Sequence, residues 1–158
     1  MIMQDKQQES LIQLEELFAK ALKDVVAIVA GMSFERAYTV NESLGDELVG
    51  MMSLQGQKVS LLAITCSLQG VRLLCSHMLG VHEDEITDRD MGDAICELVN
   101  MTAGSVKARL RETAYEYTLT TPFAMKGKGL QFIVKDRVSV VQVVLSSGEI
   151  ELKLKMIM

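Results

Sequence analysis

Apolar residues recur at two different spacings along this chain. From Ser10 to Ala30 they return every three or four positions, as on one face of a helix, and Ser10 with Gln13 forms a capping box at its start. Gly31 is expected to end this helix. The pattern then becomes extended and predicts three strands, at Glu35–Asn41, Glu47–Leu54 and Lys58–Thr65.

Helical spacing then returns twice. Ser67 is expected to cap a short helix that Gly80 ends, and the run from Thr87 to about Thr113 predicts one long helix. Apolar side chains occupy one broad arc of the long helix. The opposite stripe is narrow and polar, and consists of Asp93, Glu97, Asn100, Gly104, Lys107 and Arg111. Because a glycine inside a helix costs about 1 kcal/mol relative to alanine, Gly104 on this stripe points to the close approach of a partner or ligand.

The remainder of the chain is again extended. Strands are expected at Tyr115–Thr121, Leu130–Val134, Val138–Leu145 and Glu149–Met158, with a turn around Pro122. This order predicts an α+β fold, in which an antiparallel sheet packs with three helices and a helix-plus-strands unit is used twice. The long helix is then the counterpart of the first, which carries Glu15 and Glu16 but no asparagine three positions later.

Length and composition narrow the possible functions. The 158 residues suffice for a single domain, 1–158, and no apolar run or leader pattern predicts a membrane span or signal peptide, so a soluble cytoplasmic protein is expected. A net charge of −5 without a basic cluster argues against nucleic acid as a partner. The three cysteines and two histidines lack ligand spacing, so we expect reduced core thiols and no metal or cofactor of the protein's own.

The segment from Glu97 to Gly104 reads Glu-Leu-Val-Asn-Met-Thr-Ala-Gly and follows Asp93 by four residues. It closely resembles the signature helix of the chemotaxis phosphatase family that includes CheC, CheX and FliY. Downstream, Thr121-Pro122 followed by Gly127 and Gly129 is similar to the CheX arrangement. The Glu/Asn pair occurs once in this chain, whereas CheC-type members generally carry it on both related helices, so the resemblance is closest to CheX.

This resemblance implies faster hydrolysis of the aspartyl phosphate on a CheY-type response regulator in chemotaxis signalling. Asn100 would orient the attacking water, and Glu97 would pair with the active-site lysine of the phosphorylated receiver domain. Asp93, Gly104 and Lys107 are the expected contacts to that partner. The Mg²⁺ of the reaction is expected on the receiver, with no cofactor on this chain.

Two other interpretations remain open at this stage. In the first, the protein is a CheC-like adaptor that binds a receiver or another chemotaxis protein without hydrolysing anything. In the second, it is a globular domain whose polar stripe is simply solvated.

We also predict a homodimer built through the sheet. Its basis is that Lys58–Cys66 and Val138–Leu145 are apolar on both faces, and that Glu149–Met158 is a long terminal strand suited to edge pairing.

Overall fold

The computed structural model describes residues 2–41, 45–135 and 137–158, with side chains from Gln7 onward. The described chain forms α-helices α1 (Ile2–Ala30), α2 (Leu68–Leu79) and α3 (Asp88–Lys107), with a 3-10 turn η1 (Glu83–Glu85) before α3. Its strands are β1 (Glu35–Ala37), β2 (Leu48–Gly56), β3 (Val59–Cys66), β4 (Tyr117–Leu119), β5 (Phe123–Lys126), β6 (Val140–Ser146) and β7 (Glu151–Ile157).

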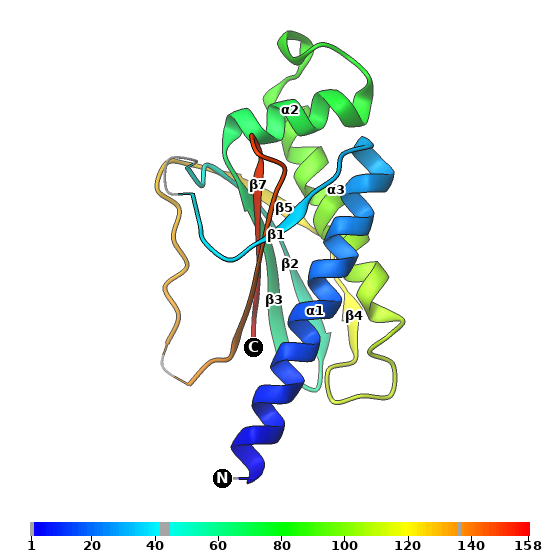
Figure 1. Ribbon diagram of the computed structural model, residues 1–158, viewed down its shortest axis with the longest axis vertical. Coiled ribbons are helices and arrows are strands. Elements are labelled where there is room, and N and C mark those ends of the chain that lie inside the picture. The colour runs from blue at the N-terminus through cyan, green and yellow to red at the C-terminus, as the bar shows by residue number, and fades with distance from the viewer. Residues whose placement is uncertain (1, 42–44, 136) are drawn as a thin grey trace.

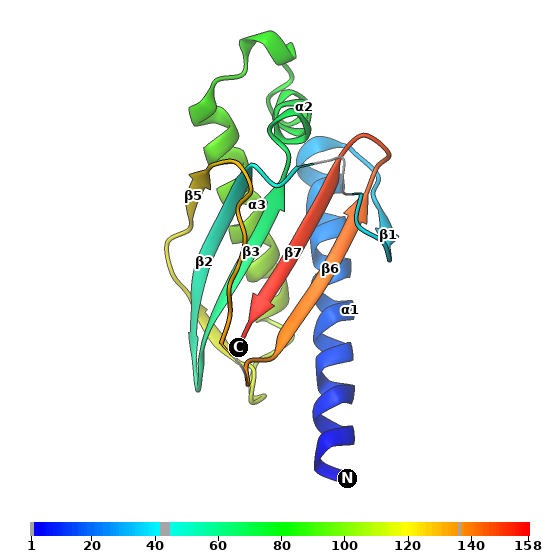
Figure 2. The same cartoon turned by 90° about the vertical axis from the view of Figure 1, so that its left-hand side faces the viewer.

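The helices and the sheet form two layers (Figure 1). Helices α1 and α3 contact each other on one face of the sheet, and α2 lies across one end of it (Figures 1 and 2). The strands are antiparallel in the order β1-β6-β7-β3-β2-β4, and β5 also pairs with β2. The predicted α+β fold of three helices packed with an antiparallel sheet is therefore confirmed.

The strand pairing follows the predicted duplication. In each half a helix leads to a short strand that pairs with the hairpin of the other half: β1 with β6, and β4 with β2. The two hairpins, β2–β3 and β6–β7, then meet through β3 and β7 in the middle of the sheet. The two halves are thus interleaved in one sheet and share its core.

Several predicted boundaries were wrong. Helix α1 runs through Ser10 instead of starting there, because the preceding Gln, Lys and Glu residues are themselves good helix formers. Helix α3 ends at Lys107, before the predicted Thr113, and the chain turns through Glu112 at a positive φ of 62°. Strand β5 was not predicted, and Leu130–Val134 is irregular instead of a strand.

The irregular segment explains why the central strands are apolar on both sides. Leu130 and Phe132 pack on the sheet face that the helices leave open, against Val49, Met51 and Ala63. Lys155 also approaches Phe132, with Nζ 5.8 Å from the ring centroid. A second copy of the chain is not needed to cover this part of the sheet.

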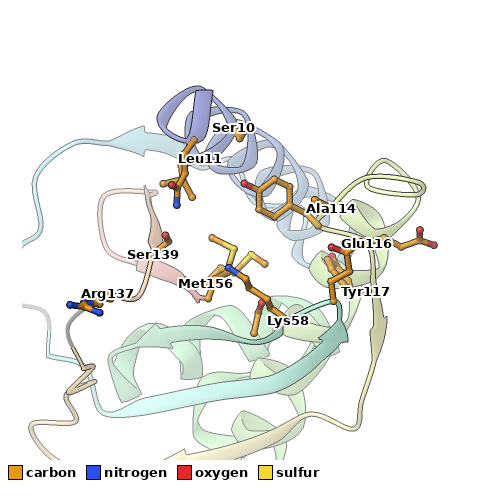
Figure 3. Close-up of a pocket in the computed structure, with 14 residues that line it drawn as sticks. Ser10, Leu11, Lys58, Ala114, Glu116, Tyr117, Arg137, Ser139 and Met156 are labelled. Atoms are coloured by element: carbon orange, nitrogen blue, oxygen red, sulfur yellow. The ribbon is translucent and has the colours of Figure 1, made fainter. Parts of the chain in front are cut away.

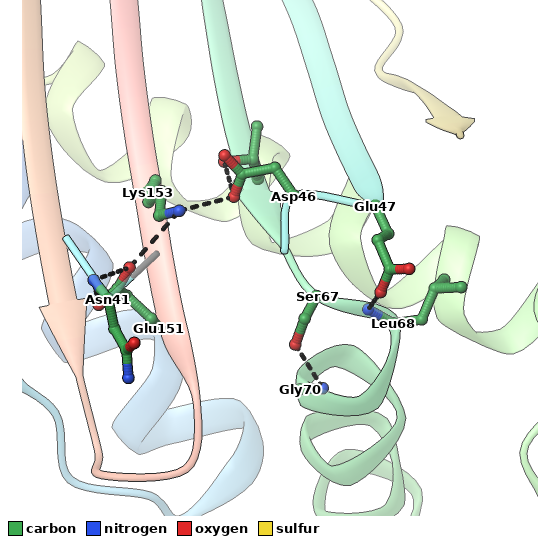
Figure 4. A network of polar contacts seen from close by, with 9 residues as sticks. Asn41, Asp46, Glu47, Ser67, Leu68, Gly70, Glu151 and Lys153 are labelled. Carbon is green, nitrogen blue, oxygen red and sulfur yellow. Dashed lines mark hydrogen bonds and ion pairs between the residues drawn. The ribbon is translucent and has the colours of Figure 1, made fainter. Parts of the chain in front are cut away.

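The terminal strand does not lie at an edge, so that premise of the predicted homodimer is wrong. Strand β7 is central, between β3 and β6, and two of its charged residues, Glu151 and Lys153, are buried in a polar network (Figure 4). Lys153 Nζ lies 2.9 Å from an Asp46 carboxylate oxygen and 3.5 Å from a Glu151 oxygen, and Glu151 accepts the backbone N–H of Asn41 at 3.0 Å. These contacts anchor the β1–β2 connection to the sheet.

Candidate functional site

The N-terminal end of α3 is fixed by a capping box and by an ion pair to strand β5. Thr87 and Asp90 form the predicted capping box, in which the Asp90 N–H donates to Thr87 Oγ1 at 3.2 Å and the Thr87 N–H to Asp90 at 2.8 Å. The Thr87 hydroxyl also donates to the Asp90 carboxylate at 2.6 Å, and this bond together with the one from the Thr87 N–H lowers the pKa of Asp90. Lys126 of β5 reaches Asp88 at 2.7 Å, which ties this end of the helix to the sheet edge.

The middle of α3 packs closely on the sheet at Gly50. A Cβ added to Gly50 would lie 2.8 Å from the Ile95 carbonyl oxygen and 3.0 Å from the Ile95 Cγ1, which no ordinary side chain can occupy. The absence of a side chain at Gly50 therefore lets β2 and α3 approach more closely than two substituted backbones could. This contact sets the depth at which the helix sits on the sheet.

The C-terminal half of α3 is held by a buried hydrogen bond from β4. The Tyr117 hydroxyl donates to the Ala103 carbonyl oxygen at 2.7 Å. Burial raises the pKa of Tyr117 well above its usual value, so the phenol stays protonated and keeps donating. Ala103 lies between Asn100 and Lys107 on the helix, so this bond restrains the end of the polar stripe.

The polar stripe faces away from this packing. Glu97 is exposed and Asn100 is half-buried, and neither side chain makes a hydrogen bond or an ion pair with the described part of the chain. Asp93, Gly104 and Lys107 are exposed on the same stripe, where Asp93 has only a loose contact of 3.9 Å with Arg89. The structure thus brings together all five predicted site residues, while Arg111 follows the end of the helix.

The stripe offers hydrogen-bonding chemistry on a rigid support. A carboxylate and a carboxamide three residues apart are separated by a rise of about 4.5 Å along the helix. The amide both donates and accepts hydrogen bonds, and the ionised carboxylate only accepts them. Among the described residues there is no group of three His, Cys, Asp or Glu side chains placed to hold a metal ion. The arrangement is suited to docking a cation and orienting a small polar molecule beside it.

The first helix uses its carboxylates differently. Glu15 of α1 is ion-paired with Arg36 of β1, and Glu16 lies 3.9 Å from the same guanidinium. These acids fasten the sheet edge to the helix. Of the two related helices, only α3 carries a Glu/Asn pair, and its carboxylate is not used in an ion pair with the described part of the chain.

The cysteines do not add chemistry to this site. Cys66 and Cys75 are buried and Cys96 is half-buried beside the stripe, and all are free thiols, as predicted. Burial raises the pKa of Cys96, and the nearby Asp93 carboxylate raises it further. A thiol held protonated in this way is a poor nucleophile.

Sequence reasoning identified the stripe but missed the residues that position it. A single glycine between apolar strand residues is a known sign of close backbone approach, so Gly50 was detectable in the sequence. Tyr117 had no such sign, because its partner Ala103 lies fourteen residues away on another element. Strand β5, which carries Lys126, was hidden by its short length and the preceding proline.

In the described part of the chain, no helix has the length and apolarity needed to cross a membrane. No curated protein matches the sequence.

Solved structures with the same architecture are numerous. A CheX chemotaxis protein from Vibrio vulnificus superimposes with a TM-score of 0.77 at 20% identity, covering 89% of this chain and 93% of that one. A CheC-like superfamily protein from Shewanella sp. PV-4 gives 0.75 at 24% identity, covering 90% and 94%. A chain from the CheX–CheY–BeF₃–Mg²⁺ complex of Borrelia burgdorferi gives 0.70 at 14% identity, covering 90% and 96%. At these identities the likenesses establish the fold.

The family follows from the sequence itself. The model of the chemotaxis phosphatase CheX matches residues 48–146, a span that begins at β2, contains all of α3 and ends with β6. This match takes in more than half of the chain and the whole Glu97–Gly104 segment. The chain therefore belongs to the CheX family of chemotaxis phosphatases.

Proposed function

We propose that this protein accelerates the hydrolysis of the aspartyl phosphate on a CheY-type response regulator in the cytoplasm. The observation that carries the proposal is the Glu97/Asn100 pair, which a CheX-family chain presents on a rigid helix without internal partners. The Borrelia burgdorferi complex, in which a CheX of this fold is bound to CheY with BeF₃ and Mg²⁺, supports a receiver domain as the partner.

Asn100 is assigned the role of orienting the attacking water. An acyl phosphate already has a good leaving group, and the receiver is expected to supply Mg²⁺ and a lysine, so the main task left is to hold water in line with phosphorus. A carboxamide does this through hydrogen bonds without acting as a base, much as a glutamine does in GTPases. The half-buried position of Asn100 limits the directions in which its amide can point.

Glu97 is assigned to pairing with the receiver lysine. The exposed carboxylate has no competing cation in the described structure, so docking need not break an internal salt bridge. Desolvation at the interface would strengthen the new ion pair relative to a surface pair. Asp93, Gly104 and Lys107 flank this contact and are assigned to the rim of the same interface.

We also propose a homodimer, but its contact is a face of the sheet and not the pairing of terminal strands. The open sheet face also carries exposed apolar side chains. Val140 of β6, Ile157 of β7 and Leu61 of β3 are adjacent in register on this face, and Val140 is 42% and Val59 63% exposed. A contact there would leave the helix layer, and with it Glu97 and Asn100, free for a receiver.

The test is the decay of a phosphorylated CheY-type receiver, measured with and without the protein alongside direct binding. Faster decay supports the phosphatase, while binding without faster decay supports the adaptor. Asn100→Ala is the matched control, because it removes only the amide: it should bind the phosphorylated receiver as the parent does and lose most of the acceleration. Parental activity in Asn100→Ala would refute the assigned role.

A further inference from the structure

A cavity of about 490 Å³ lies between the N-terminal part of α1 and the β2–β3 hairpin (Figure 3). Its walls come from α1, the β2–β3 hairpin, the loop before β4 and the end of β7. None of the residues that line it belongs to α3, so the cavity is separate from the Glu97/Asn100 stripe. Its size is in the range of about 300–1,000 Å³ that is usual for small-molecule sites.

Apolar and adaptable side chains form much of the wall. Leu11 of α1 and Met156 of β7 line the cavity (Figure 3), and so do Met158 and the aromatic residue Tyr115. Methionine is flexible and polarisable, so it adjusts to apolar groups of different shapes. This part of the cavity is suited to a short hydrocarbon or aromatic body.

One cation reaches into this apolar space. Lys58, in the β2–β3 hairpin, extends its ammonium group into the cavity (Figure 3), and it has no ion-pair partner among the residues that the structure describes. The carboxylate of Glu116, which also lines the cavity, instead accepts the backbone N–H of Glu112 at 2.9 Å. That hydrogen bond orients the Glu116 carboxylate but leaves it negative, and the two cations of the lining, Lys58 and Arg137, outnumber this one acid.

A buried hydroxyl completes the set of polar groups. Ser60 of β3 is only 8% exposed, yet it lines the cavity, and its hydroxyl makes no hydrogen bond to the described part of the chain. Buried polar groups usually have a partner, so a hydroxyl left open to a cavity marks a place where a ligand atom or water binds. It lies two residues from Lys58 on the same hairpin.

From these features we propose that the cavity binds a small amphipathic anion, namely a monocarboxylate with an apolar body. The carboxylate pairs with Lys58 and accepts a hydrogen bond from Ser60, and the apolar body packs on Met156, Met158 and Leu11. A hydrogen bond from an ammonium group to a carboxylate is stronger than a neutral one, which gives the site a preference for anions over alcohols of the same length.

The test uses octanoate as the probe and 1-octanol as its neutral counterpart. Titration calorimetry should detect octanoate binding to the full chain and at least tenfold weaker binding of octanol. Lys58→Ala, an exposed position that does not threaten the fold, should weaken octanoate binding about tenfold. Lys128→Ala, which removes an exposed lysine outside the cavity, should leave it unchanged.

Methyl NMR of labelled methionines locates the bound probe. Octanoate should shift the Met156 and Met158 resonances and leave those of Met51 and Met125 unmoved, because the latter two lie on the opposite face of the sheet. No octanoate binding, equal binding of octanoate and octanol, equal binding by Lys58→Ala, or shifts confined to other methionines would each overturn the proposal.

Discussion

Asn100 and Glu97 share one face of α3, but their chemistry separates what each contributes. The amide is neutral, so its loss removes hydrogen bonds to water and leaves the long-range attraction to a receiver unchanged. The carboxylate is charged and exposed, so it acts while the two proteins meet as well as after they have docked. Substitutions at the two positions should therefore differ in their effect on binding.

We expect Glu97→Gln to weaken receiver binding and dephosphorylation together. The substitution keeps the shape of the side chain and removes the charge that is assigned to the receiver lysine. A roughly tenfold loss of affinity, equivalent to about 1.4 kcal/mol, is expected, with little change in melting temperature because Glu97 has no partner within the described structure. A lower melting temperature with unchanged binding would instead make Glu97 a structural residue.

Single site residues could be predicted from the sequence where polar residues suited to the function also follow the helical period. The stripe was predictable because a helix places residues three and four apart on one side, and Asp93, Glu97, Asn100 and Gly104 follow that spacing. Tyr117 was overlooked because its role depends on Ala103, which lies on another element and comes close only after folding. Residues that act through such long-range contacts leave little local signal.

Elements were predicted best where local sequence decides their limits. Thr87, Ser67 and Gly80 mark helix ends through their own hydrogen bonds or φ angles, and these three ends were predicted correctly. The C-terminal end of α3 was missed because the turn that buries Leu110 serves tertiary packing. Strand β5 was missed because four residues give too short a pattern, and its pairing with β2 provides the missing support.

Gly50→Ala tests whether the depth of α3 on the sheet matters. The added methyl group meets the Ile95 backbone, so α3 or β2 must move, and we expect a loss of about 1–3 kcal/mol in the free energy of unfolding. Dephosphorylation should fall more than receiver binding, because water orientation depends on the position of Asn100 more closely than docking does.

Gly104→Ala is the matched control for this substitution. Its Cβ would meet nothing within 4 Å, and alanine is the better helix former, so the isolated protein should gain about 0.5–1 kcal/mol. Denaturant unfolding compares the two variants directly. Equal stability of Gly50→Ala and the parent would contradict the close packing described at Ile95.

Tyr117→Phe tests the restraint on the C-terminal half of α3. Loss of the buried hydrogen bond to Ala103 should cost about 1 kcal/mol at pH 7. The pKa of Tyr117 is raised in the folded state, so above its ordinary value of 10.0 the unfolded chain loses the proton first and the parent loses stability as pH rises. Unfolding at pH 7 and pH 11 should therefore show a gap between parent and variant that narrows with pH; a constant gap would contradict this account.

The two layers of the molecule present different surfaces. The helix layer presents the Glu97/Asn100 stripe, and the open sheet face carries exposed apolar residues that include Val59 and Val140. The sequence predicted the two-layer fold because helical and alternating patterns are each local. It did not reveal strand order, so the central position of β7 became known only from the assembled sheet.

The proposed homodimer is tested by sedimentation at micromolar concentration, where the parent should have about twice the chain mass. Val59→Glu combined with Val140→Glu places charges on the open sheet face and should give a monomer that still folds, because both side chains are exposed. Ile28→Glu on α1, where the residue is 75% exposed, should remain dimeric. A monomeric parent, or a dimer disrupted only by Ile28→Glu, would contradict a sheet-mediated contact.

Phosphate release under multiple-turnover conditions tests the central claim most directly. With phosphorylated receiver in large excess, a catalytic amount of the protein should release many equivalents of phosphate, at a rate proportional to its concentration. The same amount of Asn100→Ala should leave the spontaneous rate nearly unchanged although it still binds the receiver. Release at the spontaneous rate with the parent protein, despite measurable binding, would contradict the phosphatase and favour an adaptor.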